Sequence, residues 1–166
     1  MESEQDRFAR SLPLVLRWEG GFVHHPRDPG GATNLGVTLK TAQAHRLDLD
    51  GDGDTDVADL RRLTAKEAAP VYRTAYWLAA GCDRLPAGLD LMVFDAAVNQ
   101  GPSRARRFAA EATEGPVWRR IEAVRRLREG HYRSLSTFPV FGRGWLRRLT
   151  AVAETARRLA ETEAGS

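Results

Sequence analysis

The chain has 166 residues, 42% of them hydrophobic and 28% charged, which suits a soluble protein with a substantial apolar core. Its single cysteine, Cys82, excludes an internal disulfide and suits synthesis in a reducing cytoplasm. The net charge of +3 hides an asymmetry: residues 1–99 are acidic on balance, whereas residues 100–166 hold 14 basic residues, all arginine, against 7 acidic ones. This half could form a basic face for anionic partners, or a solvated surface of Arg–Glu pairs.

Helical signals dominate the first part of the chain. Residues 6–19 carry apolar side chains along one helical face, and Gly20 and Gly21 then supply a stop. Residues 22–35 are rich in Gly, Pro, Asp and Asn and predict a long loop or short hairpin. A short helix is expected over 38–47.

Further helices follow in the second part. Thr64 and Glu67 have the spacing of a capping box, which opens a helix toward Trp77 that Pro70 should bend. Four more helices are expected at 86–99, 102–113, 116–135 and 143–163. Only short strands could fit, so the sequence predicts a mainly α chain. We expect a single domain, with a catalytic core over about 6–100 and Arg-rich helices over about 101–163 packed on it.

Glu19 stands at the expected end of the first helix. Unpaired carbonyls and the negative end of the helix dipole disfavour a charged carboxylate there, so this glutamate suits a general acid. An ordinary surface glutamate is the alternative. Asp28 and Thr33 follow in the Gly/Pro-rich turn and could supply the second group that glycoside hydrolysis needs. Asp28 could instead only form the turn before Pro29.

Four ordered motifs resemble those of glycoside hydrolase family 108. They are the segments Glu19–Thr38, Tyr72–Trp77, Phe94–Gly101 and Phe141–Arg148. The family contains muramidases found as phage and prophage endolysins and in gene transfer agents. The resemblance implies a lysozyme-like helical fold and attack on the β-1,4 bond between N-acetylmuramic acid and N-acetylglucosamine. It makes Glu19 the general acid, with Asp28 and Thr33 as the other catalytic residues.

Polar side chains in or near these motifs are candidates for sugar contacts, because amides and phenols hydrogen-bond N-acetyl and hydroxyl groups. We expect the sugar groove to be lined by Asn34, Tyr76, Asn99 and Gln100. Asn99 could instead cap a helix, and Trp77 could belong to the core. The wall-binding stretch of many relatives is reduced here to residues 114–116, which leaves open whether the C-terminal helices bind wall polymer.

Residues 48–59 match the spacing of a calcium-binding loop. Oxygen ligands at alternating positions can wrap a cation, and Gly53 stands where such loops turn sharply. The ligands would be Asp48, Asp50, Asp52, Asp54, Asp56 and Asp59. The spacing and the residues that follow, Leu60–Leu63, resemble a dockerin-type loop more than a paired EF-hand. We expect one structural Ca²⁺ that the chemistry does not need, with a metal-free acidic loop as the alternative.

The sequence therefore predicts a monomeric enzyme that hydrolyses peptidoglycan glycan strands. A lytic transglycosylase and a non-catalytic, calcium-dependent wall-binding module are the alternatives. Nucleic acid is not expected as a partner, because the arginines are scattered without a recognition motif. No apolar run is long enough for a signal peptide or a membrane span. We expect cytoplasmic synthesis, no membrane insertion, and release through a holin-type pore onto periplasmic peptidoglycan.

Overall fold

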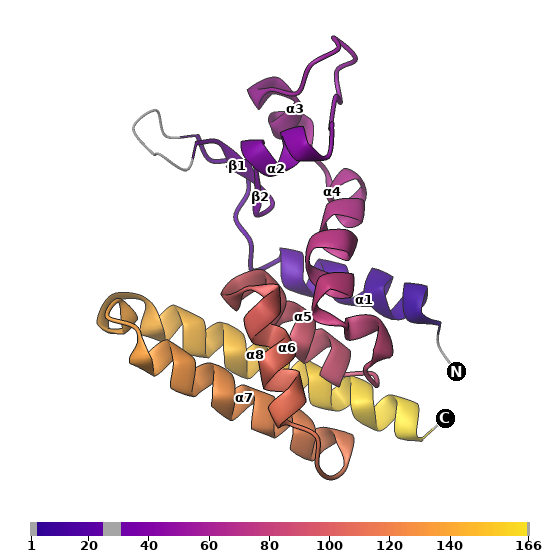
Figure 1. Cartoon of the computed structure of the whole chain (residues 1–166), viewed down its shortest axis with the longest axis vertical. Helices are drawn as coiled ribbons and strands as arrows, with labels where there is room; N and C mark the ends of the chain where they lie inside the picture. Colours follow the sequence, from indigo (N-terminus) through magenta and orange to yellow (C-terminus); the bar gives the residue numbers. More distant parts are fainter. Residues whose placement is uncertain (1–2, 25–30, 166) are drawn as a thin grey trace. The chain divides into compact units, whose positions relative to one another are not determined.

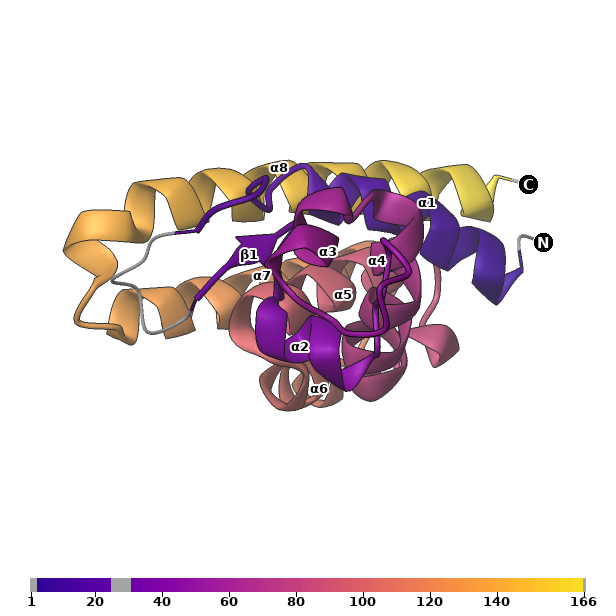
Figure 2. The same ribbon diagram turned by 90° about the horizontal axis from the view of Figure 1, so that it is seen from above.

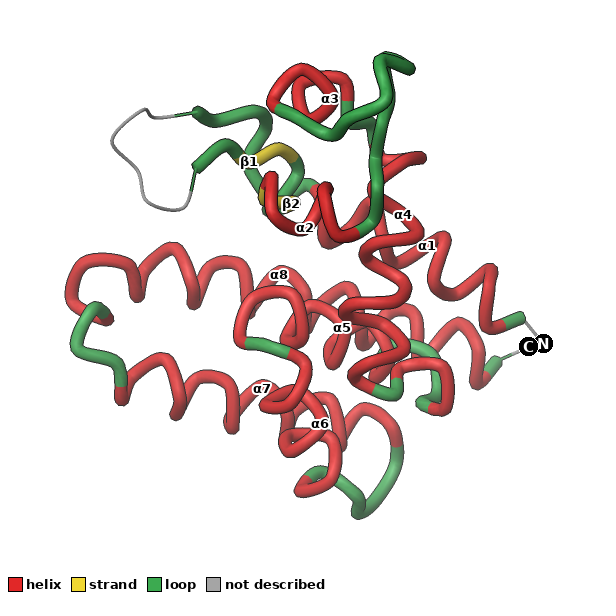
Figure 3. Tube along the Cα trace, turned by 45° about the horizontal axis from the view of Figure 1, so that its top comes forward, coloured by secondary structure: helices red, strands yellow, loops and turns green. Residues whose placement is uncertain are grey.

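The computed structural model describes residues 3–24 and 31–165. Within these residues almost all regular structure is helical, and the sheet has two short strands (Figure 3), which confirms the expected mainly α fold. None of the described helices combines the length and apolarity that crossing a membrane requires.

The chain divides into two compact units. Unit 1 comprises residues 1–11 and 74–166, and unit 2 comprises residues 12–73. The boundary between these units does not fall near residue 100, where the sequence analysis divides the chain. Helix α5 (Leu89–Gln100) packs against the C-terminal helices and belongs with them in unit 1.

Unit 2 is built from short elements. They are the second part of α1 (Glu4–Leu16), β1 (Thr33–Asn34), β2 (Val37–Thr38), α2 (Leu39–Ala44), α3 (Val57–Arg62) and α4 (Ala65–Tyr72) (Figure 1). The strands pair antiparallel, with Thr33 opposite Thr38. Leu35 and Gly36 connect them with φ angles of 49° and 73°, the positive values that a two-residue hairpin turn favours. A short hairpin thus follows the first helix, as expected, but it spans Thr33–Thr38 and extends beyond the predicted range of 22–35.

Side-chain caps start the helices of unit 2. Thr64 and Glu67 form the predicted capping box at the start of α4. Asp56 and Asp59 form a second one, which begins α3 inside a segment that the sequence interpretation treated as a metal-binding loop. Pro70 lies within α4, and the chain then widens into the π-helix η1 (Arg73–Leu78) instead of ending.

Unit 1 is a helical assembly around α5. Its other elements are the start of α1, most of η1, the 3-10 helix η2 (Cys82–Arg84), α6 (Pro102–Glu111), α7 (Val117–Ser134) and α8 (Phe138–Ala164). Helices α7 and α8 run side by side in opposite directions (Figures 1 and 2). Helix α8 begins at Phe138 rather than at the expected 143, with a proline in its first turn, where a missing N–H costs nothing.

Helix α5 is buried on all sides. Residues 89–97 are all shielded from solvent, including two aspartates. Asp90 pairs with Arg7 at 2.9 Å, and Asp95 pairs with Arg128 at 2.7 Å and accepts a hydrogen bond from Nε of Arg148 at 2.9 Å. Arginine partners from three other helices thus compensate the buried carboxylates of α5.

Candidate active site

Glu19 lies in the turn that follows α1. The helix ends at Leu16, three residues earlier than the sequence predicts, and its last carbonyls are bonded in a tighter turn. The Glu19 N–H donates to the Leu16 carbonyl at 3.0 Å, and the Trp18 N–H donates to the Val15 carbonyl at 3.0 Å. The side chain of Glu19 is half-buried. The tight turn therefore fixes the backbone of the predicted general acid.

The Glu19 carboxyl lies against the hairpin turn of unit 2. A methyl group on Gly36 would stand 3.0 Å from Oε2 of Glu19 and 2.5 Å from the hydroxyl oxygen of Tyr72. Both distances are shorter than ordinary contacts, so only glycine fits between these two groups. The turn thus brings a carboxyl and a phenol hydroxyl together at one point.

Tyr72 is a part of this site that the sequence interpretation missed. Its ring is almost fully buried at the end of α4, and its hydroxyl donates to the Leu35 carbonyl at 2.6 Å. The hydrogen bond ties α4 to the hairpin turn beside Glu19. The signal for Tyr72 is the motif Tyr72–Trp77, which Tyr72 opens and from which the sequence predicts only Tyr76 as a site residue.

Of the other two predicted catalytic residues, the structure describes Thr33 but not Asp28. Thr33 lies in β1, half-buried, and exchanges two backbone hydrogen bonds of 2.8 Å with Val23. Asp28 lies outside the described residues. Thr33 and Glu19 both belong to unit 2.

Asn34 lies in the interior of unit 2. Its side chain is buried, and its amide nitrogen donates to the carbonyls of Leu60 at 2.8 Å and Leu63 at 3.4 Å. These bonds use both amide hydrogens to hold β1 against the end of α3. The amide nitrogen of Asn34 thus has a structural role, and a contact of this side chain with sugar stays a prediction.

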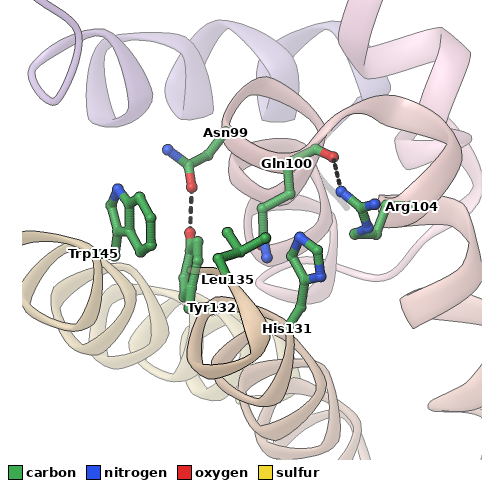
Figure 4. A pocket seen from close by; sticks show the side chains of 7 residues that line it. All are labelled: Asn99, Gln100, Arg104, His131, Tyr132, Leu135 and Trp145. Carbon is green, nitrogen blue, oxygen red and sulfur yellow. Dashed lines mark hydrogen bonds between the residues drawn. The ribbon is translucent and has the colours of Figure 1, made fainter. Parts of the chain in front are cut away.

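The predicted sugar contacts at the end of α5 border a pocket in unit 1 (Figure 4). It measures about 310 Å³ and is lined by Asn99, Gln100, Arg104, His131, Tyr132, Leu135 and Trp145. The Asn99 oxygen accepts from the Tyr132 hydroxyl, and its amide nitrogen points away from that tyrosine in Figure 4. Asn99 thus presents a hydrogen-bond donor at the pocket.

Gln100 borders the pocket with its amide already engaged. Its oxygen accepts from Nε of Arg128 at 2.8 Å, and its nitrogen donates to the Arg128 carbonyl at 3.5 Å. Tyr76 does not line the pocket and lies in η1. Trp77 packs edge-on against Phe8 and Phe94 with no exposed surface, so it is the core residue that the sequence left as one alternative.

The aspartate loop connects α2 to α3 in unit 2 (Figure 3). Its six carboxylates form two groups of three, in which one oxygen from each member lies within 4.8 Å of the others. The groups are Asp48, Asp50 and Asp52, and Asp54, Asp56 and Asp59. Gly51 and Gly53 have φ angles of 80° and 98°, as the sharp turn of a cation-binding loop requires.

Charge repulsion and backbone hydrogen bonds act in opposite directions within this loop. The neighbouring charge of Asp52 raises the pKa of Asp54, and burial together with Asp52 raises the pKa of Asp50. Asp59 instead accepts from the N–H groups of Asp56 and Leu49, at 2.8 and 2.6 Å, which lowers its pKa. The loop closes on Asp59 while its other carboxylates repel one another.

Comparisons with known proteins identify the family of this chain. The family model Glycosyl hydrolase 108 matches residues 12–101, which include Glu19, Gly36, Tyr72 and Asn99. The solved structure of SagA from Brucella abortus is similar over 92% of this chain and 95% of its own, with 33% sequence identity and a TM-score of 0.74. None of the curated proteins matches the sequence. A match over more than half of the sequence, joined to similarity in three dimensions over nearly all of it, shows that this chain is a member of glycosyl hydrolase family 108.

Proposed function

We propose that this chain hydrolyses the β-1,4 bond between N-acetylmuramic acid and N-acetylglucosamine in peptidoglycan, with Glu19 as general acid. Family membership supplies the class of reaction, the hydrolysis of a glycosidic bond. The observation that supports Glu19 is the contact of its carboxyl with the Gly36 turn and its closeness to the Tyr72 hydroxyl. A glycine at this point also lets the backbone approach a sugar ring.

In the proposed reaction, Glu19 gives its proton to the glycosidic oxygen as the bond to the anomeric carbon breaks. A second group stabilises the positive charge that develops on the sugar or positions the incoming water. We assign this task to Asp28, assisted by the hydroxyl of Thr33. The hydroxyl of water ends on the anomeric carbon, and the proton of water restores the acid.

A matched pair of variants tests the role of Glu19. Glu19→Gln keeps the size of the side chain but removes its acidic proton, so clearing of purified Gram-negative sacculi should fall at least a hundredfold. Glu111→Gln, at an exposed glutamate that ends α6, should keep the wild-type rate. Both variants should unfold at the wild-type midpoint. If Glu19→Gln keeps a tenth of the activity, Glu19 is not the acid.

The mass of the soluble fragments separates the proposed reaction from its rivals. Hydrolysis leaves fragments that contain one added water, whereas a lytic transglycosylase closes an anhydro ring and adds none. Fragments with the anhydro mass would replace hydrolysis with the transglycosylase reaction. Binding to sacculi without release of any fragment would instead support a non-catalytic, calcium-dependent wall-binding module.

We further propose that the loop over 48–59 holds one structural Ca²⁺. The six carboxylates in two close groups and the turn at Gly53 support a site for a hard cation. The ion would offset the repulsion between these carboxylates, which raises the pKa of Asp54 and adds to the effect of burial on the pKa of Asp50. Chelation by EDTA should therefore lower the melting temperature and leave the bond-breaking residues in place.

The proposed cellular role is that of a monomeric endolysin, made in the cytoplasm and released through a holin-type pore. Expression alone in a Gram-negative host should be harmless until the inner membrane is permeabilised, because the substrate lies beyond that membrane. Lysis before any membrane lesion would show another export route and reject the endolysin role.

A further inference from the structure

The pocket of unit 1 contains two basic side chains and no acidic one. Arg104 and His131 line it, and no aspartate or glutamate is among its lining residues. Figure 4 places both basic groups on the side of Gln100 that is remote from Trp145. The pocket therefore suits a ligand group with negative charge.

Arg104 has no carboxylate partner among the described residues, unlike Arg125, Arg128 and Arg133 of α7. Its Nη1 donates to the Gln100 carbonyl at 3.1 Å, which fixes the guanidinium and leaves its other N–H groups available. Arg125 and Arg133, by contrast, both pair with Glu129. Arg104 also lies in the first turn of α6, where the N-cap, Gly101, supplies no side-chain cap and the helix dipole is positive.

His131 adds a second nitrogen group to this wall. Burial and the nearby charge of Arg104 lower the pKa of His131. Within the described part of the chain, no hydrogen bond is made by its ring nitrogens. A neutral ring can donate one hydrogen bond to a ligand beside the charged Arg104.

A buried hydrogen-bond network orients the amide of Asn99, which is the hydrogen-bond donor on the opposite wall of the pocket. Asp95 binds Arg128 at 2.7 Å, Arg128 donates to the Tyr132 hydroxyl at 3.3 Å, and Tyr132 donates to the oxygen of Asn99. The Tyr132 ring also stacks on Trp145, with centroids 5.2 Å apart. This arrangement directs the Asn99 oxygen inward and leaves its N–H₂ group for a carbonyl or N-acetyl oxygen.

We propose that this pocket binds the carboxylate of a peptide attached to a muramic acid residue. Arg104 would grip the carboxylate, and Asn99 would donate to an amide or N-acetyl oxygen of the same ligand. A volume of about 310 Å³ suits one sugar ring or a short stretch of peptide. The inference rests on the proposed function, because it takes peptidoglycan as the substrate, and it adds recognition of the stem peptide.

A soluble muramyl dipeptide tests the proposal with the intact wild-type chain, because this ligand has no β-1,4 bond to cleave. Calorimetry should compare the dipeptide with its carboxamide, in which the negative charge is removed. The carboxamide should bind about tenfold more weakly, as expected for the loss of a charged hydrogen bond. Arg104→Gln should weaken binding of the dipeptide about tenfold and leave binding of the carboxamide unchanged.

Arg107→Gln is the matched control, because Arg107 is exposed on the same helix and does not line the pocket. It should bind both ligands as the wild type does. Equal affinity for the dipeptide and the carboxamide overturns the proposal, even if Arg104→Gln proves unstable. Competition by acetate at the same concentration as the dipeptide also overturns it, since the pocket would then take any small anion.

The outcome is separable from that of the proposed function. Clearing of sacculi by the wild type without charge-dependent binding would reject the pocket and keep the enzyme. Charge-dependent binding without clearing would keep the pocket and reject the enzyme.

Discussion

The contact between Gly36 and the Glu19 carboxyl can be tested by adding a single methyl group. In Gly36→Ala the new Cβ would stand 2.5 Å from the Tyr72 hydroxyl oxygen and 3.3 Å from Cγ of Glu19. Tyr72 is buried and cannot move without giving up its 2.6 Å hydrogen bond to the Leu35 carbonyl. The methyl group should therefore displace the tyrosine hydroxyl, the acid, or both.

The magnitude follows from two contributions. An L-residue at the Gly36 φ angle of 73° costs about 1–2 kcal/mol, and loss of the tyrosine hydrogen bond costs about 1 kcal/mol. We expect Gly36→Ala to lower the free energy of unfolding by about 2–3 kcal/mol in urea denaturation. The displaced acid should also lower sacculus clearing about a hundredfold, since a misplacement of about 1 Å can have that effect.

Gly31→Ala separates strain from steric displacement. Gly31 has a φ angle of 70°, almost that of Gly36, but a methyl group there would meet nothing within 4 Å. This variant should lose only the backbone contribution, about 1–2 kcal/mol. If both variants are destabilised equally, and Gly36→Ala still clears sacculi at the wild-type rate, the close packing of Gly36, Tyr72 and Glu19 is not needed for activity.

Three further predictions address other parts of the chain. Tyr72→Phe should lower the free energy of unfolding by about 1 kcal/mol through loss of the bond to Leu35, and a wild-type urea midpoint would contradict that. Millimolar Ca²⁺ should raise the melting temperature of the wild type but not of Asp54→Asn, because an ion that binds only the folded state stabilises the folded state. If neither calcium nor EDTA changes the melting curve of the wild type, the loop is not a calcium site. Burial raises the pKa of Asp90 to about 6 from 3.8, so its contribution to stability is full below pH 3.8 and is lost as the pH rises through 6. The free energy of unfolding of the wild type relative to Asp90→Asn should therefore fall by about 3 kcal/mol from pH 3 to pH 7 in urea titrations, and a constant difference would refute this.

The sequence predicts the helices well where local signals act alone. The capping box at Thr64 and Glu67 places the start of α4, and the long helices of unit 1 lie close to their expected bounds. The prediction of the helices is incomplete where the same residues fit two different sequence patterns. Asp56 and Asp59 have the spacing both of metal ligands and of a capping box, so the metal pattern concealed helix α3.

The candidate site was predicted only in part, because the type of a residue does not determine where its side chain points. Glu19 followed from its motif, but the importance of Tyr72 depends on a contact with a turn 36 positions earlier in the chain. Asn34 and Asn99 are both amides within family motifs. One is turned into the interior, where it donates to two carbonyls, and the other borders a pocket. Only the packing of the surrounding helices separates the two roles.

The arginines of the second half show the same principle for charge. Counting residues predicts a basic face, but many of these charges are neutralised where they stand. Arg128 and Arg148 are buried against Asp95, and Arg125 bridges Glu122 and Glu129 on α7. On α7, Arg125 and Arg133 form Arg–Glu pairs of the kind that the sequence offered as the alternative. A general attraction to anionic surfaces would draw on unpaired exposed charges and weaken with salt, whereas a fixed and partly shielded group such as Arg104 can select one carboxylate. Whether an arginine can act in one way or the other depends on whether it has a carboxylate partner, and only the folded structure determines which arginines have one.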